Sequence, residues 1–300
     1  FGIILSLLEL NSQSINYGSN QLKPVNFIIG TIAIVAAASI SADQLTLNTQ
    51  RQIVKPDDPL RFITKREKIE WDAKKTAIVV CDMWSKHWCD SATLRVMEMA
   101  PHMNRVIQIA RNKGALIIHC PSGGLEFYAN TPMRKLAKQA PAVSTKIRLQ
   151  DWCNLDRERE PELPIDDSDG GCDCQPKCDA NKNPMNLQQI ADIEIHDQDA
   201  ITDSAEAYYL MSQKGITNVI VMGVHTNMCV LGRPFSIRQM VYQDQNVLLM
   251  RDLTDTMYNS KQPPFVSHFR GTDLIVDHIE RYWCPTITSS DFLADAPFVF

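Results

Sequence analysis

Two reactive side chains stand where apolar runs of the sequence end. Asp82 closes the run TAIVVCD, and Cys229 lies in VHTNMCV, just after the run NVIVMG. A cysteine at the start of a helix is favoured as a thiolate by the helix dipole and the free backbone N–H groups, and a nearby carboxylate could accept its proton. Asp82 and Cys229 are therefore candidates for a general base and a low-pKa nucleophile. The alternative is that Asp82 caps a helix and that Cys229 is a small buried apolar residue.

The stretch DDSDGGCDCQPKC, residues 166–178, is the other place where reactive side chains gather. Its C-x-C-x3-C spacing could ligate zinc, but a structural zinc site uses four ligands and only three are obvious here. The stretch does not match the calcium-binding loop of an EF-hand. A thiol redox protein is disfavoured, because no C-x-x-C lies at a strand-to-helix turn.

The elements that would position these residues alternate between short apolar runs and amphipathic stretches. Continuous apolar runs are typical of strands that are buried on both faces. Apolar residues at three- and four-residue spacing predict helices, and Gly114 and Gly215 mark the ends of two of them. The predicted strands are residues 76–82, 115–120, 190–195, 218–223 and 246–250, and the predicted helices are residues 92–113, 130–139, 204–214, 233–242 and 265–282.

This alternation predicts an α/β fold, with a parallel sheet covered by helices on both faces. In such a sheet a ligand binds beyond the carboxyl ends of the strands. Residues that follow a predicted strand are therefore the first candidates for a site, and they are Asp82, Trp84, His87, His119, Cys120, Cys229, Arg251 and Asp252.

The composition excludes a wholly disordered chain, a collagen and a coiled coil. The chain has 300 residues, of which 44% are hydrophobic and 22% charged, as in ordinary globular proteins. Its net charge of −5 gives no reason to expect a nucleic-acid partner, which needs a basic face.

We expect residues 43–75, which are polar and charged, to be a lead-in arm or an edge hairpin. Residues 76–300 are expected to be the main domain, with a Cys- and Asp-rich insertion at about residues 141–189.

The N-terminal residues predict export. Residues 27–40, FIIGTIAIVAAASI, follow Lys23 and precede small residues, and they are too few to span a bilayer as a helix. This order is typical of a secretory signal. We therefore expect residues 1–42 to be a targeting segment and the mature protein to be periplasmic or extracellular, with no membrane contact once the signal is removed.

Export bears on the nine cysteines, because an oxidising compartment permits disulfides. The odd number leaves at least one cysteine unpaired within a monomer, and the candidate nucleophile must be free. We expect a disulfide in the insertion rather than a metal. The favoured pairings join Cys178 to Cys172 or Cys174, or join one of these to Cys89 or Cys153.

The stretches TAIVVCDMW and VIVMGVHTNMCVLGRPFSIRQM resemble the isochorismatase-like cysteine hydrolases, over roughly residues 70–285. This superfamily includes nicotinamidases, N-carbamoylsarcosine amidohydrolases and ureidoacrylate hydrolases. The resemblance implies a three-layer α-β-α fold with a six-stranded, mostly parallel, Rossmann-like sheet. It also implies a homo-oligomer that acts on a small-molecule substrate without a cofactor.

The resemblance assigns roles to individual residues. The family triad is Asp, Lys and Cys, so Asp82 would be the base, and Cys229 would attack a carbonyl or carboximidate carbon. A cis peptide is expected between Val224 and His225, and the backbone N–H groups of His225 and Cys229 would face the developing oxyanion. The retained thiol implies hydrolysis of a C–N bond, in an amide or ureido compound, through a covalent intermediate.

The family lysine has no counterpart at the expected place. No lysine lies between Asn183 and Gln213, and counting back from the glycine that precedes the next strand reaches His196. His196 could supply the hydrogen bond or the charge, or Lys86 or Arg251 could approach from another loop. His196 could also be an exposed residue at a strand end. Without a replacement, the chain could be a non-catalytic small-molecule-binding or assembly member of the same fold.

Other residues are expected around the pocket. Trp84 and His87 would form its wall, unless they pack against the first helix. Arg233 would hold a substrate carboxylate, unless it forms a surface ion pair. His119 and Asn227 complete the expected pocket. No metal site of the nicotinamidase type is expected, because PSGGL after the second predicted strand lacks that family's Asp and His pattern.

Overall fold

The structure, a computed structural model, describes residues 43–300. The predicted targeting segment therefore lies outside the described residues. In residues 43–300, no helix combines the length and the apolar character needed to cross a membrane. The strands are β1 Gln44–Lys55, β2 Asp58–Asp72, β3 Thr76–Cys81, β4 Trp84–Lys86, β5 Leu116–Cys120, β6 Asn186–Gln189, β7 Ala200–Ile201, β8 Asn218–Val224, β9 Asn246–Asp255 and β10 Thr286–Ile287.

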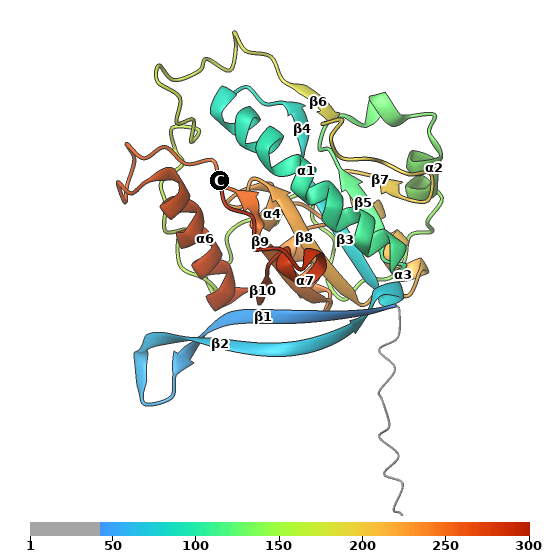
Figure 1. Cartoon of the computed structure of the whole chain (residues 1–300), viewed down its shortest axis with the longest axis horizontal. Coiled ribbons are helices and arrows are strands. Elements are labelled where there is room, and N and C mark those ends of the chain that lie inside the picture. The colour runs from blue at the N-terminus through green and yellow to red at the C-terminus, as the bar shows by residue number, and fades with distance from the viewer. Residues whose placement is uncertain (1–42) are drawn as a thin grey trace, which may run out of the picture. The chain divides into compact units, whose positions relative to one another are not determined.

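Seven α-helices lie along the chain among these strands in residues 43–300, and Figure 1 labels most of them. They are α1 Asp90–Asn112, α2 Pro132–Lys138, α3 Glu206–Gln213, α4 Cys229–Gly232, α5 Ile237–Tyr242, α6 His268–Tyr282 and α7 Ser290–Leu293. Short 3-10 helices cover Ala73–Lys75 and Leu125–Tyr128.

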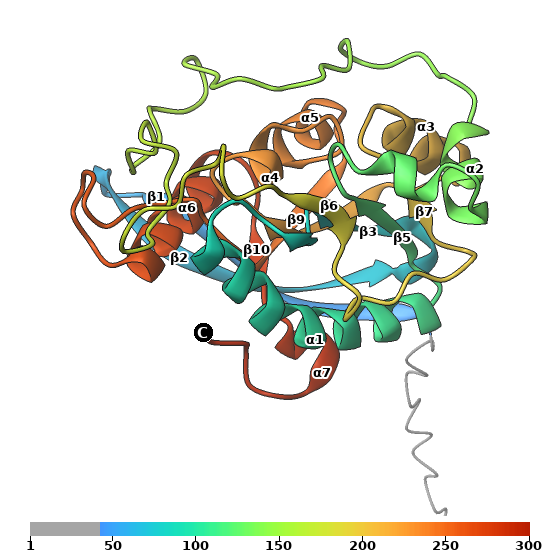
Figure 2. The ribbon, with the colours of Figure 1, turned by 90° about the horizontal axis from the view of Figure 1, so that it is seen from above.

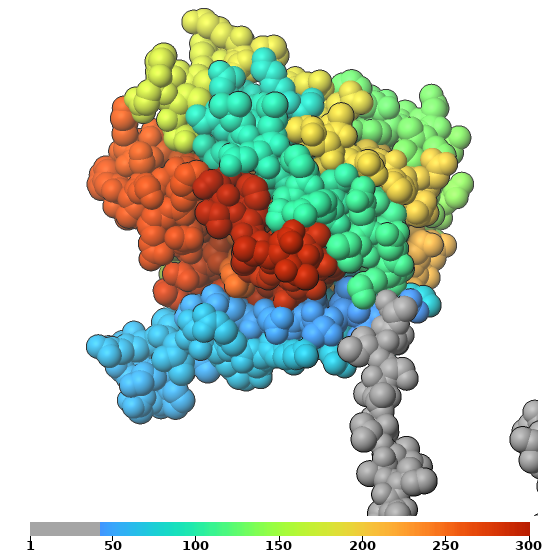
Figure 3. Space-filling model, viewed as in Figure 1, coloured from blue at the N-terminus to red at the C-terminus, as the bar shows by residue number. Residues whose placement is uncertain are grey.

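The main sheet has the strand order β2-β1-β10-β9-β8-β3-β5-β7. The pairs from β10 to β7 are parallel, whereas β1 pairs antiparallel with both β2 and β10. The expected parallel sheet is thus present, and the expected edge hairpin, β1–β2, extends it to eight strands. Figure 3 shows the tip of this hairpin standing clear of the neighbouring elements.

Both faces of the sheet are covered, which explains the continuous apolar runs in the sequence. In β3, Ala77, Val79 and Cys81 pack into one core with helices α2 to α6, and Ile78 and Val80 pack into a second core with α1. Successive side chains of a strand point to opposite faces, so a strand between two layers needs apolar residues at every position. Figure 2 shows α1 and α7 on one side of the sheet and α2 to α5 on the other.

Two predicted strands need correction. The prediction for residues 190–195 is wrong: Ile190 and Ile193 are buried, but they lie three residues apart in a turn in which Ile193 N donates to Ile190 O. The strand at the sheet edge is the two-residue β7 instead. The prediction that a strand ends at Met250 is also wrong, because β9 continues through Arg251 to Asp255.

The helix predicted at residues 233–242 begins four residues later in the structure, as α5, and a separate helix of one turn, α4, precedes it. The first turn, α4, ends at Gly232, and Arg233 has an extended backbone with ψ 157°. The cause is Pro234, since a proline disfavours the helical conformation in the residue before it. The reactive cysteine therefore begins a helix of one turn.

The predicted insertion is irregular from the end of α2 to the start of β6. Figure 2 shows this segment passing outside α5 and returning towards α6 and β6. It is fixed to the domain by backbone contacts, including a hydrogen bond of 2.6 Å from Cys153 N to Gly232 O. The insertion therefore lies over the elements that carry Cys229.

Candidate active site

Asp82 lies directly after β3, between the carboxyl ends of two neighbouring strands. Cys81 pairs in register with Cys120 of β5 and with Gly223 of β8. Asp82 has a positive φ of 50° and a fully buried side chain, and its Oδ1 accepts a hydrogen bond of 2.7 Å from Ser122 N. Its Oδ2 is buried without a hydrogen-bond partner among residues 43–300. The turn thus leaves one carboxylate oxygen available inside the protein.

Cys229 reaches this carboxylate from the end of β8. The peptide bond between Val224 and His225 is cis, at the place that the resemblance implies. The turn is closed by hydrogen bonds from Met228 N and Val230 N to His225 O, of 2.9 and 3.2 Å. The Cys229 thiol then lies beside Asp82, close enough to share a proton with it.

The pKa values of this pair differ from the sequence-based expectation. Burial raises the pKa of the Cys229 thiol, and the neighbouring Asp82 carboxylate raises it further. The expected low-pKa thiol is therefore wrong for the free protein, because the four-residue α4 gives little dipole stabilisation against this burial. Burial also raises the pKa of Asp82 to about 6. At neutral pH the pair is a thiol beside a carboxylate.

The positive charge at this pair belongs to Arg233. Its guanidinium acts on the Cys229 thiol and on the Asp82 carboxylate and lies 5.6 Å from the Trp152 ring centroid. The charge of Arg233 lowers the pKa of both partners, although burial outweighs it. Arg233 is thus neither a surface ion pair nor remote from the thiol. Its position four residues after Cys229 is the signal that could have identified it.

His196 is not at the thiol, and the prediction that it replaces the family lysine is wrong. Its ring lies 3.3 Å from Glu194 Oε2, with 42% of the side chain exposed. It lines a cavity of about 610 Å³ with Tyr128 and Gln189, and neither catalytic candidate lines that cavity. Counting residues back from a glycine assumes the loop lengths of the family that the sequence resembles, and the loops of this chain differ in length. Arg251, one of the two other proposed cations, donates a hydrogen bond to Thr286 of β10.

Two histidines and a tryptophan lie beside the cis peptide. The rings of His87 and His225 are 5.0 Å apart at their centroids, and Trp84 stacks on His87 at 5.8 Å. Burial lowers the pKa of His87 to about 4 and that of His225 to about 3. Both rings are therefore neutral at neutral pH and serve as hydrogen-bonding groups.

Several buried polar atoms around this point have no hydrogen-bond partner among residues 43–300. They are Asp82 Oδ2, Trp84 Nε1, Ser122 Oγ, His225 Nε2 and Arg233 Nε. Buried polar groups are normally satisfied, so unpartnered ones need an explanation. Here all of them belong to the carboxyl ends of β3, β5 and β8 or to the turns that follow. This is the arrangement expected of a site that binds a small polar molecule.

Asn227 has a structural part in this arrangement. Its Nδ2 donates to Asp167 Oδ2 at 2.7 Å, and its Oδ1 accepts from Met257 N at 2.9 Å. It thus joins the turn before Cys229 to the insertion and to the loop after β9.

His119 lies within the sheet layer. It is fully buried, and its ring nitrogens lie 2.9 Å from Gln189 Oε1 and 3.2 Å from Asp199 Oδ2. Arg111 of α1 binds the same Asp199 carboxylate. The Asp199 carboxylate therefore joins α1 to β5 and the loop before β7, and His119 also joins β5 to β6 through Gln189.

The sequence matches no family model and no curated protein. Among solved structures, the chain is similar to a cysteine hydrolase from Pseudomonas syringae pv. phaseolicola 1448A, at 14% identity over 74% of this chain and 92% of the other, with a TM-score of 0.46. It is also similar to an isochorismatase from Pseudomonas putida KT2440, at 10% identity over 74% and 91%, with a TM-score of 0.42. A third is N-carbamoylsarcosine amidase from Thermoplasma acidophilum, at 11% identity over 60% and 79%, with a TM-score of 0.32.

Proposed function

We propose that the protein is an isochorismatase-like cysteine hydrolase that cleaves a C–N bond of a small amide or ureido compound. The observation that carries the proposal is the convergence of a thiol, a carboxylate and a guanidinium at the carboxyl ends of β3 and β8. The unpartnered polar atoms around these groups support a polar substrate.

The first half of the reaction forms a covalent intermediate. The Cys229 sulfur attacks the substrate carbon while its proton passes to Asp82, so a C–S bond forms and the carbonyl oxygen gains a negative charge. The backbone N–H groups of His225 and Cys229 stabilise that oxygen. The C–N bond then breaks as the leaving nitrogen takes the proton from Asp82, which leaves an acyl group on the sulfur.

The second half releases the acyl group. Water attacks the thioester carbon, Asp82 takes a proton from the water, and the C–S bond breaks to return the thiol. Arg233 lies within reach of both the sulfur and the carboxylate and stabilises their negative charge in both halves. An arginine remains protonated in a half-buried place and presents several donors in one plane. It can therefore fill the part that the resemblance assigns to a lysine.

The test is hydrolysis of a panel of carboxamides and N-carbamoyl compounds, with ammonia release as the readout. The expected result is turnover of at least one compound by the wild type and by Cys284→Ala, a control at a buried cysteine outside the site. Cys229→Ala is expected to abolish turnover, and quenched wild type to show an acyl adduct in its intact mass. Full activity of Cys229→Ala would refute the mechanism.

The non-catalytic alternative has one observation in its favour, the raised pKa of the Cys229 thiol. A binding protein would bind members of the same panel, detected by a rise in its unfolding temperature, without releasing ammonia. Tight binding with no turnover and no adduct would support this alternative and contradict the hydrolase.

A further inference from the structure

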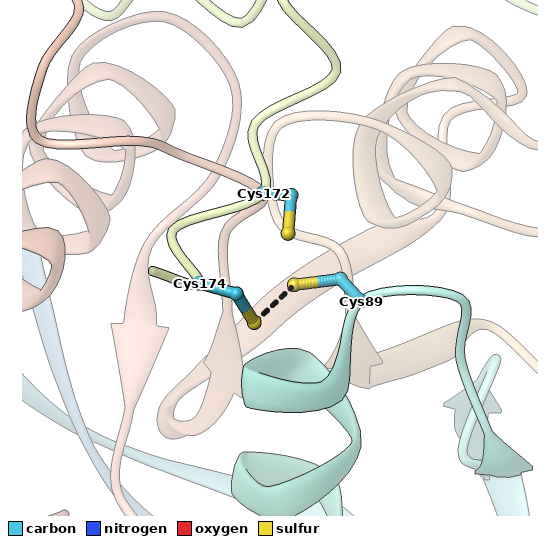
Figure 4. A group of neighbouring side chains, drawn as sticks. All are labelled: Cys89, Cys172 and Cys174. Atoms are coloured by element: carbon cyan, nitrogen blue, oxygen red, sulfur yellow. Dashed lines mark hydrogen bonds between the residues drawn. The ribbon is translucent and has the colours of Figure 1, made fainter. Parts of the chain in front are cut away.

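A group of cysteines outside the active site brings together two distant parts of the chain. The sulfur atoms of Cys89, Cys172 and Cys174 all lie within 4.8 Å of one another (Figure 4). Cys89 is the residue before α1, and the other two belong to the insertion. Cys89 and Cys172 are fully buried, and Cys174 is partly buried. The packing of the insertion therefore supplies a thiol that the sequence spacing alone did not identify.

A fourth thiol, that of Cys178, adjoins this group. Its side chain packs against the same small core as the other three, and its sulfur lies outside the group in which all sulfur atoms are within 4.8 Å of one another. Its sulfur also lies 3.6 Å from Asp90 Oδ2. The insertion thus supplies three thiols and the start of α1 supplies one. A closed structural zinc site uses four ligands of this type.

The spacing of the Cys89, Cys172 and Cys174 sulfur atoms fits a single ion. Four sulfurs arranged as a tetrahedron about zinc, each about 2.3 Å from the metal, are about 3.8 Å apart. The sulfurs of Cys89 and Cys174 are 3.8 Å apart. A cluster with several iron atoms would hold its thiolates farther apart, and a single disulfide would engage two sulfurs and leave the third without a role.

The surroundings of Cys174 suit a thiolate rather than a neutral thiol. Cys174 Sγ lies 3.2 Å from Ser91 N, which donates to it, and 2.9 Å from Ser91 Oγ. Both groups belong to the first turn of α1, a helix of 23 residues whose start favours negative charge. Hydrogen bonds of this kind orient metal ligands and stabilise their charge.

Nearby carboxylates are already engaged, which leaves Cys178 as the fourth ligand. Asp173 binds Arg95 through both of its oxygens, at 3.0 and 3.3 Å. Asp90 Oδ1 accepts a hydrogen bond of 2.7 Å from Asn183. Asp173 Oδ1 also lies 3.9 Å from the Cys89 sulfur, and Asp90 Oδ2 faces Cys178. Because Arg95 and Asn183 already hold these carboxylates, we expect thiols as the ligands.

We propose that Cys89, Cys172, Cys174 and Cys178 bind one zinc ion. Four thiolates leave no position open for water, so the site is structural. The zinc ion joins the insertion to the start of α1, two residues after His87, and so fixes the loop that carries the wall of the active site. Zinc replaces the disulfide that the sequence favoured: none of the nine cysteines, all of which lie in the described residues, is bonded to another.

The test is the metal content of the full chain, purified under reducing conditions and measured by mass spectrometry of the elements. About one zinc per chain is expected in the wild type and in Cys284→Ala. Cys89→Ser and Cys172→Ser are expected to lose it. After exchange with cobalt(II), the wild type should show the intense visible bands and sulfur-to-cobalt charge transfer of a four-thiolate site, and Cys178→Ser should weaken the charge-transfer band.

The wild type alone decides the matter if the serine variants fail to fold. A strong chelator is expected to expose four thiols to maleimide in the native protein, identified by peptide mapping as those of the proposed ligands. Wild-type protein without zinc, or with a bond between Cys89 and Cys174, would overturn the proposal. So would zinc that the variants retain, or iron in its place.

Discussion

Asp82, Cys229 and Arg233 form a set in which the protonation of the acid and of the thiol depends on their neighbours. Burial favours the protonated form of both the acid and the thiol. At Asp82, hydrogen bonds from Cys229 and Ser122 and then the Arg233 charge oppose this, and at the thiol the guanidinium opposes it. The set therefore holds one shared proton between sulfur and oxygen at neutral pH. Substrate binding has to move that proton and has no need to create a free thiolate beforehand.

The pH profile of hydrolysis is expected to report on Asp82. Asp82 must be ionised to accept the thiol proton, and its pKa is about 6 because of burial. The value of kcat/KM is therefore expected to rise with pH and to level off above about pH 7. Initial rates across this range with a saturable substrate would check it. A flat profile between about pH 5 and 8 would contradict the assignment of Asp82 as the base.

Asp82 also makes the stability of the fold depend on pH. Its pKa is about 6 in the folded protein and 3.8 ordinarily. Between these values the folded state keeps a proton that the unfolded state has released, so the stability falls as the pH rises. Asp82→Asn cannot ionise and is expected to be more stable than the wild type at about pH 8 by on the order of 1–3 kcal/mol, with little difference at about pH 4. Urea unfolding at the two pH values measures this.

Asp199 provides the control with the opposite sign. Burial opposes its ionisation, but hydrogen bonds from His119 and Arg111 lower its pKa to about 2. Its contribution to stability is present above the ordinary pKa and is lost as the pH falls towards 2. Asp199→Asn is therefore expected to be less stable than the wild type at about pH 8. If both variants changed stability in the same direction, burial of charge would not be the cause.

Arg233 is expected to matter for the rate, and His196 is not. Arg233→Gln removes the charge beside the thiol and should lower kcat by about 10²–10³-fold, the usual effect of losing one charge-stabilising group. Arg233→Lys keeps the charge without the planar donors and should recover part of the rate. His196→Gln is the matched control, with kcat near that of the wild type. A larger loss for His196→Gln than for Arg233→Gln would reverse the assignment.

Sequence reasoning located the two residues fixed by strand ends and missed the cation. Asp82 and Cys229 follow buried apolar runs, and in a parallel sheet the ends of such runs lie together. The cation was sought on a loop, by counting, where length is free to vary. Arg233 directly follows α4, and its N donates to Cys229 O, so its spacing of four residues from Cys229 is a local and firmer signal.

At the scale of elements, the site depends on how closely β8 approaches β3. Gly223 has φ 109°, and a Cβ on it would lie 2.1 Å from Cys81 O. No side chain fits there without moving the strand that leads to Asp82. The glycine is thus required by both its backbone conformation and its neighbour.

Gly223→Ala is expected to destabilise the protein by about 2–4 kcal/mol, because it combines an unfavourable φ with a clash against backbone. Gly215 is the matched control: its φ is also positive, at 67°, but nothing lies within 4 Å of the added Cβ. Gly215→Ala should therefore cost only about 1 kcal/mol. Urea unfolding of the two variants separates the effect of the clash from that of φ. Equal losses of stability would contradict the close approach of β8 to β3.

The helices and strands were predictable where burial imposes a clear apolar pattern on the sequence. β3, β5 and β8 are buried on both faces, and their apolar runs gave them directly. The edge strand β7 was not predictable, because two residues carry no period. The irregular insertion is ordered by side-chain contacts with distant elements, which no local pattern encodes.

At the scale of the whole domain, Glu160 is the residue that ties the insertion to the helices. It is buried, and its carboxylate binds Arg238 of α5 and His278 of α6, each at 2.7 Å. Trp283 Nε1 donates to it at 2.7 Å as well. Burial opposes its ionisation, but these contacts hold the pKa of Glu160 below its ordinary value.

Glu160→Ala is expected to lower the free energy of unfolding by about 3–5 kcal/mol, because it leaves the Arg238 charge buried without its partner. Glu162→Ala is the control two residues away, where the ion pair with Arg157 is exposed. It should change stability by at most about 1 kcal/mol. Denaturant titration of both variants measures the difference. A loss of the same size in both would mean that the insertion does not depend on the buried carboxylate.

The β1–β2 hairpin also affects how molecules of this protein meet. β2 ends the sheet, so its outer backbone groups resemble the template on which amyloid-like strands add, whereas β7 at the opposite end offers two residues. Along β2, Lys65, Arg66, Glu67 and Lys68 are exposed and surround the backbone with charge. Charge of this kind discourages a second strand from adding, but salt screens it. The resistance of this edge to strand addition is therefore electrostatic, and it is weakest at high ionic strength.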